Sequence, residues 1–243
     1  MDLWLIGIGT GNPDHVTREA QRALRDAGTI LVPRKGPGKD DLAELRHRIL
    51  TEADAKAPVI EFDYPVRDEA LPYKDRVIAW HDEIARRWRT ALDGAKGPVA
   101  LLVWGDPSLY DSTLRIAARL DPAPTVRVVP GITALVALTA AHAIPFNGLA
   151  GSVAVTTGRR LRDHGWPGEA DSVAVMLDGE CSFTSLDDEY DIWWGAYLGM
   201  AEQILDAGPL PETAPRIVEA RAKARATHGW IMDTYLLRKR GVT

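Results

Sequence analysis

The segment LWLIGIGTGNP at residues 3–13 decides the fold class of this chain. Its first six residues are uncharged and, apart from one glycine, apolar, as is typical of a buried parallel strand. The glycines that follow allow a tight turn and let a ligand approach the backbone closely. Residues 17–27 then place alanine and leucine side chains on one face, with Thr17 in position to cap a helix. A strand, a turn and a helix in this order predict an α/β fold.

The same alternation continues through the first half of the chain. Further strands are predicted at residues 29–32, 58–62, 98–104 and 125–129, and further helices at 40–50, 72–92, 112–120 and 132–141. Because a helix follows almost every strand, the strands are expected to lie parallel in one doubly wound sheet.

A second, less regular alternation begins near residue 151. Strands are predicted at residues 153–156, 173–177, 192–194 and 231–236, and helices at 203–207 and 215–226. The uneven spacing of these strands favours a mixed sheet. The chain is therefore predicted to form two α/β domains, residues 1–131 with a parallel sheet and residues 132–243 with a mixed sheet.

The composition excludes several classes of protein. Lys and Arg number 29 and Asp and Glu number 34, and this formal net charge of −5 disfavours a general nucleic-acid binder. The single cysteine, Cys181, excludes an internal disulfide and a cysteine cluster for a metal, and it suits a reducing compartment. No uncharged apolar stretch reaches the roughly 18 residues of a membrane span, and the run at residues 3–8 lacks the basic flank of a signal peptide. We therefore expect a cytoplasmic protein that binds no metal, nucleic acid or membrane.

Two more strand ends carry glycine and proline. Residues 104–110 read WGDPSLY and residues 128–135 read VVPGITAL; together with residues 7–13 we call these segments the glycine turns. Ligands of open parallel sheets bind outside the carboxyl ends of the strands, so the glycine turns predict one ligand site. Simple turns remain the alternative, with helix capping by Asp111, Ser112 or Thr133.

The first glycine turn is not a dinucleotide-binding fingerprint. Asn12 stands where G-x-G-x-x-G requires its last glycine, and Arg34 follows the second strand where an acidic residue is expected. An arginine at that place would suit the 2′-phosphate of NADP. A protein that binds NADP or another nucleotide therefore remains an alternative.

Taken in order, G-x-G-x-G-x-P, G-D-P-x-x-Y and V-V-P-G-I-T-A resemble the motifs of the tetrapyrrole (corrin/porphyrin) methylases. The first motif departs from the family at Thr10, where the family usually has proline. The resemblance extends through residues 155–161, 175–179, 194–199 and 229–237, essentially over the whole chain. It implies a two-domain fold with a ligand cleft between the domains, S-adenosyl-L-methionine as methyl donor, and a homodimer.

Within the family, the later segments are most similar to members that act in cobalamin biosynthesis. This similarity implies that the chain methylates precorrin-5 at ring carbon C1 and releases its acetyl group as acetate. Methylation of another precorrin position, or of another substrate, remains an alternative.

The resemblance also implies which residues contact the donor. The turn at Gly105 is expected to hold its methionine and ribose part, and backbone groups of the second domain to hold the adenine. The full expected set is Gly9, Trp104, Gly105, Asp106, Tyr110, Thr133, Ala134, Met176, Tyr197 and Leu198.

Removal of an acetyl group needs a base that activates water. Asp106 and Asp178 are the candidates, since both lie near predicted strand ends; Asp233 and His142 are further possibilities. A structural role as a cap or in a salt bridge is the alternative for each carboxylate.

A polycarboxylate macrocycle requires local positive charge. Two basic segments could supply it. Arg34 and Lys35 lie in one, and Arg159 and Arg160 lie in the other. A solvated surface is the alternative for both segments.

Overall fold

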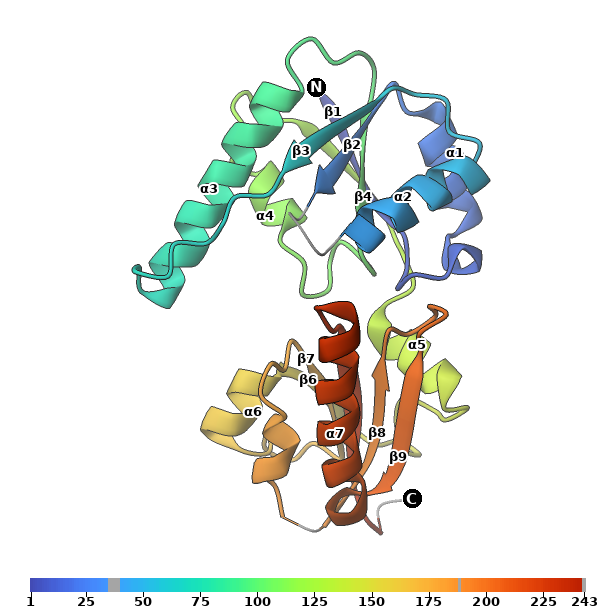
Figure 1. The fold of residues 1–243 in the computed structure, drawn as a ribbon, viewed down its shortest axis with the longest axis vertical. Coiled ribbons are helices and arrows are strands. Elements are labelled where there is room, and N and C mark those ends of the chain that lie inside the picture. The colour runs from blue at the N-terminus through green and yellow to red at the C-terminus, as the bar shows by residue number, and fades with distance from the viewer. Residues whose placement is uncertain (35–39, 188, 242–243) are drawn as a thin grey trace. The chain divides into compact units, whose positions relative to one another are not determined.

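The computed structural model describes residues 1–34, 40–187 and 189–241. The chain divides into two compact units, Met1–Ile132 and Thr133–Thr243. Each unit is an α/β structure built around one five-stranded sheet (Figure 1).

The sheet of the first unit is parallel throughout, as predicted. Its strands are β1 (Asp2–Gly7), β2 (Thr29–Arg34), β3 (Val59–Asp63), β4 (Val99–Val103) and β5 (Thr125–Val129). They lie in the order β3-β2-β4-β1-β5, and all their pairings are parallel. Ile6 of β1 is in register with Leu102 of β4 and Val129 of β5. The carboxyl ends of these three strands therefore meet at one edge of the sheet.

The helices of this unit cover both faces of its sheet. They are α1 (Arg18–Asp26), α2 (Asp40–Glu52), α3 (Tyr73–Ala91) and α4 (Thr113–Ala117), with a 3-10 turn at Pro13–His15. Thr17 caps α1 as expected, since its hydroxyl accepts the N–H of Ala20 at 3.1 Å. The helix predicted at residues 112–120 is shorter than expected, because its regular part ends at Ala117.

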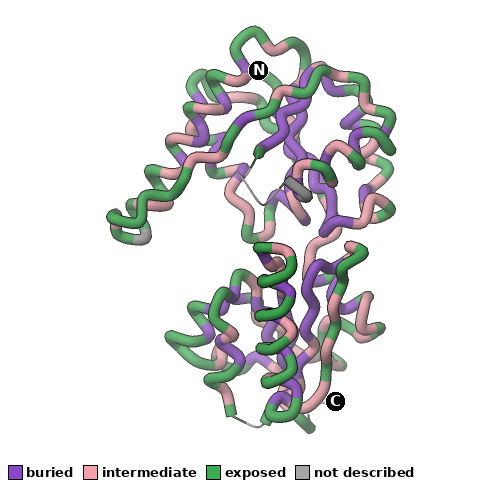
Figure 2. Tube along the Cα trace, viewed as in Figure 1, coloured by how far each residue is buried: buried purple, intermediate pink, exposed green. Residues whose placement is uncertain are grey.

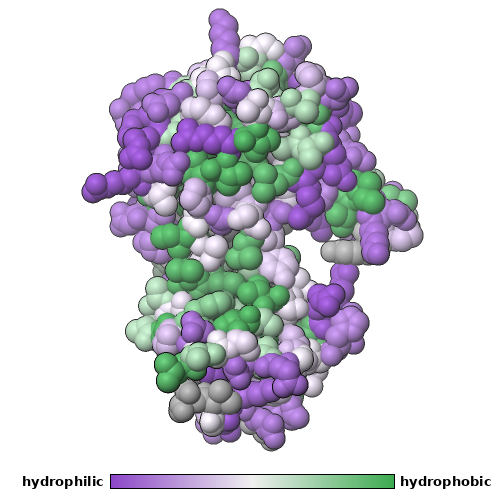
Figure 3. Space-filling model, turned by 180° about the vertical axis from the view of Figure 1, so that it is seen from behind, coloured by the Kyte–Doolittle hydropathy of each residue, from purple (hydrophilic) through white to green (hydrophobic). Residues whose placement is uncertain are grey.

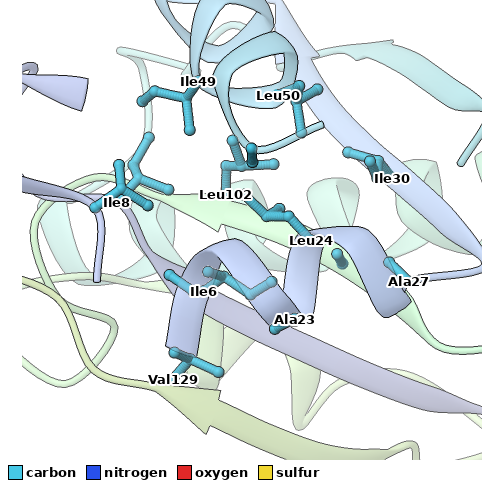
Figure 4. Packing of buried hydrophobic residues seen from close by; sticks show 14 of the residues in the cluster. Ile6, Ile8, Ala23, Leu24, Ala27, Ile30, Ile49, Leu50, Leu102 and Val129 are labelled. Atoms are coloured by element: carbon cyan, nitrogen blue, oxygen red, sulfur yellow. The ribbon is translucent and has the colours of Figure 1, made fainter. Parts of the chain in front are cut away.

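Apolar side chains fill the space between helices and strands. Leu24 of α1 and Ile49 of α2 pack with Ile6, Ile30 and Leu102 of the strands (Figure 4). A second cluster, which includes Trp88 of α3, covers the opposite face. Buried residues run along the strands in the centre of each unit (Figure 2).

The second unit carries a mixed sheet, as predicted. Its strands are β6 (Val153–Thr157), β7 (Ser172–Met176), β8 (Tyr190–Ala196), β9 (Ile204–Pro209) and β10 (Asp233–Lys239). In the order β6-β7-β10-β8-β9, only β6 and β7 pair in parallel. Its helices are α5 (Ala134–Ala141), α6 (Gly158–His164) and α7 (Leu210–His228), with a 3-10 turn at Ser182–Ser185.

Helices α5 and α7 cover opposite faces of this sheet. Trp194 and Gly195 are neighbours on β8, so they point to opposite sides. Trp194 donates a hydrogen bond to Asp233, which also pairs with Arg221 of α7. A Cβ on Gly195 would instead lie 2.9 Å from a methyl carbon of Leu138 in α5.

The helix predicted at residues 203–207 is wrong, because Ile204–Pro209 forms strand β9 and pairs antiparallel with β8. Residues 204–207 alternate between half-buried and exposed, which is the period of a strand. Asp206 binds Arg216 of α7 through two hydrogen bonds of 2.7 and 2.9 Å, which holds the strand against that helix. Tertiary pairing overrides the local pattern in so short a segment. Helix α6 is not predicted from the sequence, and α7 begins at Leu210 instead of residue 215.

Hydrophobic residues also reach the surface. Seen from behind, they are interspersed with hydrophilic residues on both units (Figure 3). Within the described residues, no helix combines the length and the apolar character needed to cross a membrane.

Candidate functional site

The three glycine turns lie in direct backbone contact at the carboxyl edge of the first sheet. The N–H of Gly105 donates to the carbonyl of Gly9 at 2.7 Å, and the N–H of Gly9 donates back at 3.3 Å. A Cβ on Gly131 would lie 2.1 Å from the carbonyl oxygen of Gly105 and 2.8 Å from the Cα of Gly7. Only residues without a side chain allow this approach, and the result is an edge built from backbone groups.

Asp106 ties the second glycine turn to the third. Its Oδ1 accepts the N–H of Ser108 at 2.8 Å and also the Ser108 hydroxyl, and its Oδ2 accepts the N–H of Gly131 at 2.9 Å. Burial alone would raise the pKa of this carboxyl group, but the hydrogen bonds from Ser108 and Gly131 hold the pKa below its usual value. The group is therefore ionised at neutral pH and is a weak base.

The second glycine turn leads directly into α4. Trp104 is half-buried at the end of β4, and Tyr110 has a φ of 49° and is 39% exposed. Asp111 caps the helix, because its Oδ1 accepts the N–H and the hydroxyl of Thr113 at 2.6 and 2.5 Å. Ser112, the other predicted cap, makes no capping hydrogen bond with its side chain.

Two polar atoms near the first glycine turn are buried and have no hydrogen-bond partner in the described part of the chain. They are the hydroxyl oxygen of Thr10 and the Nδ1 of His15. Unpaired buried polar groups are costly, and a ligand can satisfy them. Neither residue is predicted from the sequence to be a site residue. One sequence feature could have pointed to Thr10: it occupies the position of the first motif where the family usually has proline.

The strand ends of the second unit bring the other predicted donor contacts together. Met176 ends β7, and Tyr197 and Leu198 follow β8. The N–H of Tyr197 donates to the carbonyl of Met232, just before β10, at 3.0 Å. Because β10 runs antiparallel to β7 and β8, all three predicted residues lie at one end of this sheet.

The Tyr197 side chain itself points into the unit. It is 1% exposed, and its hydroxyl donates to the carbonyl of Trp230 at 2.5 Å. Only its backbone is left to face a ligand, as the sequence analysis expects for the adenine side. The residues after β7 and β8, Leu177 and Tyr197, have φ angles of 55° and 50°. Such strained backbone is concentrated at functional sites.

Thr133 and Ala134 begin α5. The Thr133 hydroxyl accepts the N–H of Val136 at 3.3 Å, so the predicted capping role is confirmed. A contact between these two residues and the donor stays a prediction.

Asp178 is buried, and both of its oxygens are engaged. Oδ1 accepts the N–H of Glu180 at 3.0 Å and the hydroxyl of Ser182 at 2.9 Å. Oδ2 accepts the N–H of Ser182 at 2.6 Å and the hydroxyl of Tyr235 at 2.7 Å. These four hydrogen bonds stabilise the turn after β7, and they count against a role as general base.

Asp233 and His142 are also engaged inside the second unit. Asp233 accepts hydrogen bonds from Arg221 and from the indole N–H of Trp194. Nε2 of His142 lies 2.9 Å from the carbonyl oxygen of Trp194. Across the part of the chain that the structure describes, no three His, Cys, Asp or Glu residues form a group that could hold a metal ion.

The predicted basic residues lie on the surface. Arg34 donates to Asp63 at 3.1 and 3.3 Å and lies 3.5 Å from Glu61, so its charge is shared with two carboxylates. Lys35 lies outside the described residues. Arg159 and Arg160 are exposed in the first turn of α6.

Comparison with known proteins gives consistent matches along the chain. The sequence model of the Tetrapyrrole (Corrin/Porphyrin) Methylases matches residues 2–214. The precorrin-6A synthase [deacetylating] of Sinorhizobium sp is 46% identical over 250 residues, which cover 98% of this chain and 95% of that protein.

Solved structures agree with the sequence matches. A cobalamin synthesis related protein (CobF) from Corynebacterium diphtheriae has a TM-score of 0.84 and 37% identity over 98% of both chains. The uroporphyrin-III C-methyl transferase of Thermus thermophilus, complexed with S-adenosyl homocysteine, shares the fold at 19% identity. Its TM-score is 0.63, and the match covers 98% of this chain and 92% of that one.

Proposed function

The chain belongs to the tetrapyrrole (corrin/porphyrin) methylases, and from this premise we propose that it is a C-methyltransferase of cobalamin biosynthesis that uses S-adenosyl-L-methionine. The proposed reaction is methylation of precorrin-5 at C1 with loss of acetate, which gives precorrin-6A. The observation that carries the proposal is the direct backbone contact between the three glycine turns. It occurs in a chain that is 46% identical to the precorrin-6A synthase of Sinorhizobium sp, an enzyme named for the proposed product. The proposal includes a homodimer in the cytoplasm.

Two features of the first unit fit a bound donor. The glycine turns pack so closely that a Cβ added at Gly7 or Gly131 would force them apart, and the buried hydroxyl of Thr10 has no partner there among the described residues. When bound, S-adenosyl-L-methionine supplies a methyl group already activated by its sulfonium charge. The protein must then mainly position the two reactants. We assign the methionine and ribose part to Gly105 and Asp106.

The remaining donor contacts come from residues around this edge and from the second unit. We assign Gly9, Trp104 and Tyr110 to the donor side of the first unit. Thr133, Ala134, Met176, Tyr197 and Leu198 complete the proposed set. The buried Tyr197 side chain supports a contact through the backbone only.

Acetate release requires separate chemistry. Water adds to the acetyl carbonyl, the bond between that carbon and the ring breaks, and its electron pair returns to the macrocycle as acetic acid leaves. Of the two predicted bases, Asp106 lies at the glycine turns, whereas Asp178 is saturated by hydrogen bonds. The low pKa of Asp106 favours orienting a water molecule over taking its proton.

Incubation with precorrin-5 and a donor labelled in its methyl group tests the proposed function. We expect a product that has gained the labelled methyl group and lost the acetyl group, measured by mass spectrometry together with free acetate. A methyl gain without acetate would favour another precorrin position. Binding of NADP without binding of S-adenosylhomocysteine, measured by calorimetry, would support the nucleotide-binding alternative instead.

The variant Asp106→Asn tests the link between the second and third glycine turns. Hydrogen bonds to a charged group are stronger than neutral ones, so we expect S-adenosylhomocysteine to bind roughly tenfold more weakly. Asp171→Asn is the matched control, because Asp171 accepts the N–H and hydroxyl of Ser152 in the same way, at 2.7 and 3.1 Å, in the second unit. Equal affinities of the two variants would remove Asp106 from the donor site.

A further inference from the structure

Arg46 is a buried arginine without a carboxylate partner in the described part of the chain. It lies in the middle of α2 and is 4% exposed. One guanidinium nitrogen, Nη1, donates to the carbonyl of Leu42 one turn back at 2.9 Å. Its Nε is fully buried and has no hydrogen-bond partner among the residues that the structure describes. Burial of a charge without a partner is costly, so a group outside the unit is expected to complete this environment.

Burial and the neighbouring charges act on the pKa of Arg46 in opposite directions. Burial lowers the pKa of Arg46, and Tyr64 and Asp111 act in the opposite direction. Burial also raises the pKa of Tyr64 to about 12, so this hydroxyl is neutral at physiological pH. The Asp111 carboxylate caps α4 through Thr113. An arginine remains charged in such a site.

Arg46 lies beside the indole ring of Trp104 at the carboxyl edge of the sheet. Its guanidinium carbon is 5.9 Å from the ring centroid of Trp104, the residue that follows β4. Its other close neighbour, Tyr64, follows β3. Tyr64 follows the edge strand β3, Trp104 follows β4, and α2 also packs against the 3-10 turn Pro13–His15 that follows β1.

We propose that Arg46 and Trp104 form a carboxylate-binding subsite that takes one carboxylate of the macrocyclic substrate. The Nε edge of a guanidinium matches a carboxylate with two parallel hydrogen bonds, and Nε of Arg46 is buried without a hydrogen-bond partner among the described residues. The indole of Trp104 offers the apolar surface that a flat ring requires. The subsite rests on the proposed function. It assigns recognition of a substrate carboxylate to Arg46 instead of Arg34, because Arg34 is already paired with Asp63 and Glu61.

The carboxylate of the donor's methionine part has the same chemistry as a substrate carboxylate. Separate titrations of the donor product and of the macrocycle distinguish the two sources.

The test compares Arg46→Met with Arg48→Met. Arg48 is an exposed arginine of the same helix, paired with Glu52 at 2.9 Å, so its replacement controls for loss of one positive charge. For Arg46→Met we expect the KM for precorrin-5 to rise roughly tenfold or more, because a hydrogen-bonded ion pair is lost. We expect kcat to change by less than about threefold and the Kd of S-adenosylhomocysteine to stay unchanged. Arg48→Met should leave all three quantities unchanged.

Two further measurements separate recognition from a structural role. Arg46→Met should melt at the wild-type temperature or above, because it removes an unpaired buried charge. Arg46→Lys keeps the charge without the planar fork and should give an intermediate KM. A lower melting temperature together with weaker binding of both ligands would overturn the subsite. So would a weaker affinity for S-adenosylhomocysteine with an unchanged KM.

A direct titration separates failure of the subsite from failure of the proposed function. If the wild-type protein does not convert precorrin-5, uroporphyrin III serves as a stable polycarboxylate macrocycle in a fluorescence titration. We then expect Arg46→Met to bind it roughly tenfold more weakly than wild type does. Equal binding by both proteins, or binding by neither, would overturn the subsite.

Discussion

Replacing Gly131 with alanine is expected to abolish donor binding and to destabilise the protein by about 3 kcal/mol or more, as severe overpacking does. The added Cβ would lie 2.1 Å from the carbonyl oxygen of Gly105 and 2.8 Å from the Cα of Gly7. Both neighbours are backbone atoms, so neither can move away as the end of a flexible side chain could. The three glycine turns would have to separate, and the hydrogen bond from the Gly131 N–H to Asp106 would be lost with them.

Thermal unfolding and calorimetry check this prediction. A loss of about 3 kcal/mol corresponds to a melting temperature lower by roughly 6–12 °C in a chain of this size. S-adenosylhomocysteine should show no measurable binding. Gly148→Ala is the control, because no atom lies within 4 Å of the position of its added Cβ. Wild-type stability and affinity of Gly131→Ala would show that the close contact of the turns is not required.

Replacing Arg221 with methionine is expected to cost about 3–5 kcal/mol of stability, because it leaves a buried carboxylate without its counter-charge. Nε and Nη2 of Arg221 bind the two oxygens of Asp233 at 2.7 and 3.2 Å. The two side chains are only 9% and 7% exposed. Burial would lower the pKa of Arg221, but the hydrogen bonds and charge of Asp233 raise it above its usual value. After the substitution, the indole N–H of Trp194 is the one side-chain donor to this carboxylate that remains among the described residues.

Arg221 also joins the turn after β7 to α7. Its Nη2 donates to the carbonyl of Asp178 at 2.6 Å, and its Nη1 donates to the sulfur of Cys181 at 2.9 Å. Loss of these contacts adds to the effect of the unpaired carboxylate. We therefore expect the predicted adenine contacts, which lie at this end of the sheet, to weaken as well.

Urea unfolding measures the stability change, and Arg216→Met is the matched control. Arg216 lies in the same helix and binds Asp206 through two hydrogen bonds, but its side chain is 52% exposed. Exposed ion pairs contribute only about 0–1 kcal/mol. A similar loss of stability in both variants would contradict the view that burial makes the Arg221 pair essential.

Local signals were sufficient for most elements and for the glycine turns. Thr17 and Thr133 cap helices as predicted, because a hydroxyl at the start of a helical pattern binds the nearest free N–H. The turn at Gly105 follows a run of apolar residues, which marks the end of a buried strand. The strand at residues 204–209 could not be predicted from local signals. Its structure is decided by pairing with β8, because the segment is too short to specify its own conformation.

The candidate site was predictable in part. The turn at Gly105 and Asp106 was identified from its own sequence. Thr10 and Arg46 were not identified as site residues, because an unpartnered buried atom is created by packing and leaves no local pattern. Asp178 was expected to be a base. Three of its hydrogen bonds come from the nearby Glu180 and Ser182, and the fourth comes from Tyr235, far along the chain, so only the tertiary structure reveals it.

By itself, the sequence determined the α/β class, the parallel first sheet, the mixed second sheet and the family, since all of these depend on the order and spacing of neighbouring residues. Only the tertiary structure decided which charges are neutralised. Arg34 pairs with Asp63, whereas Arg46 is buried without a carboxylate partner among the described residues. Electrostatic energy depends on the distance between charges and on their burial. Both quantities are set by contacts between segments far apart in the chain.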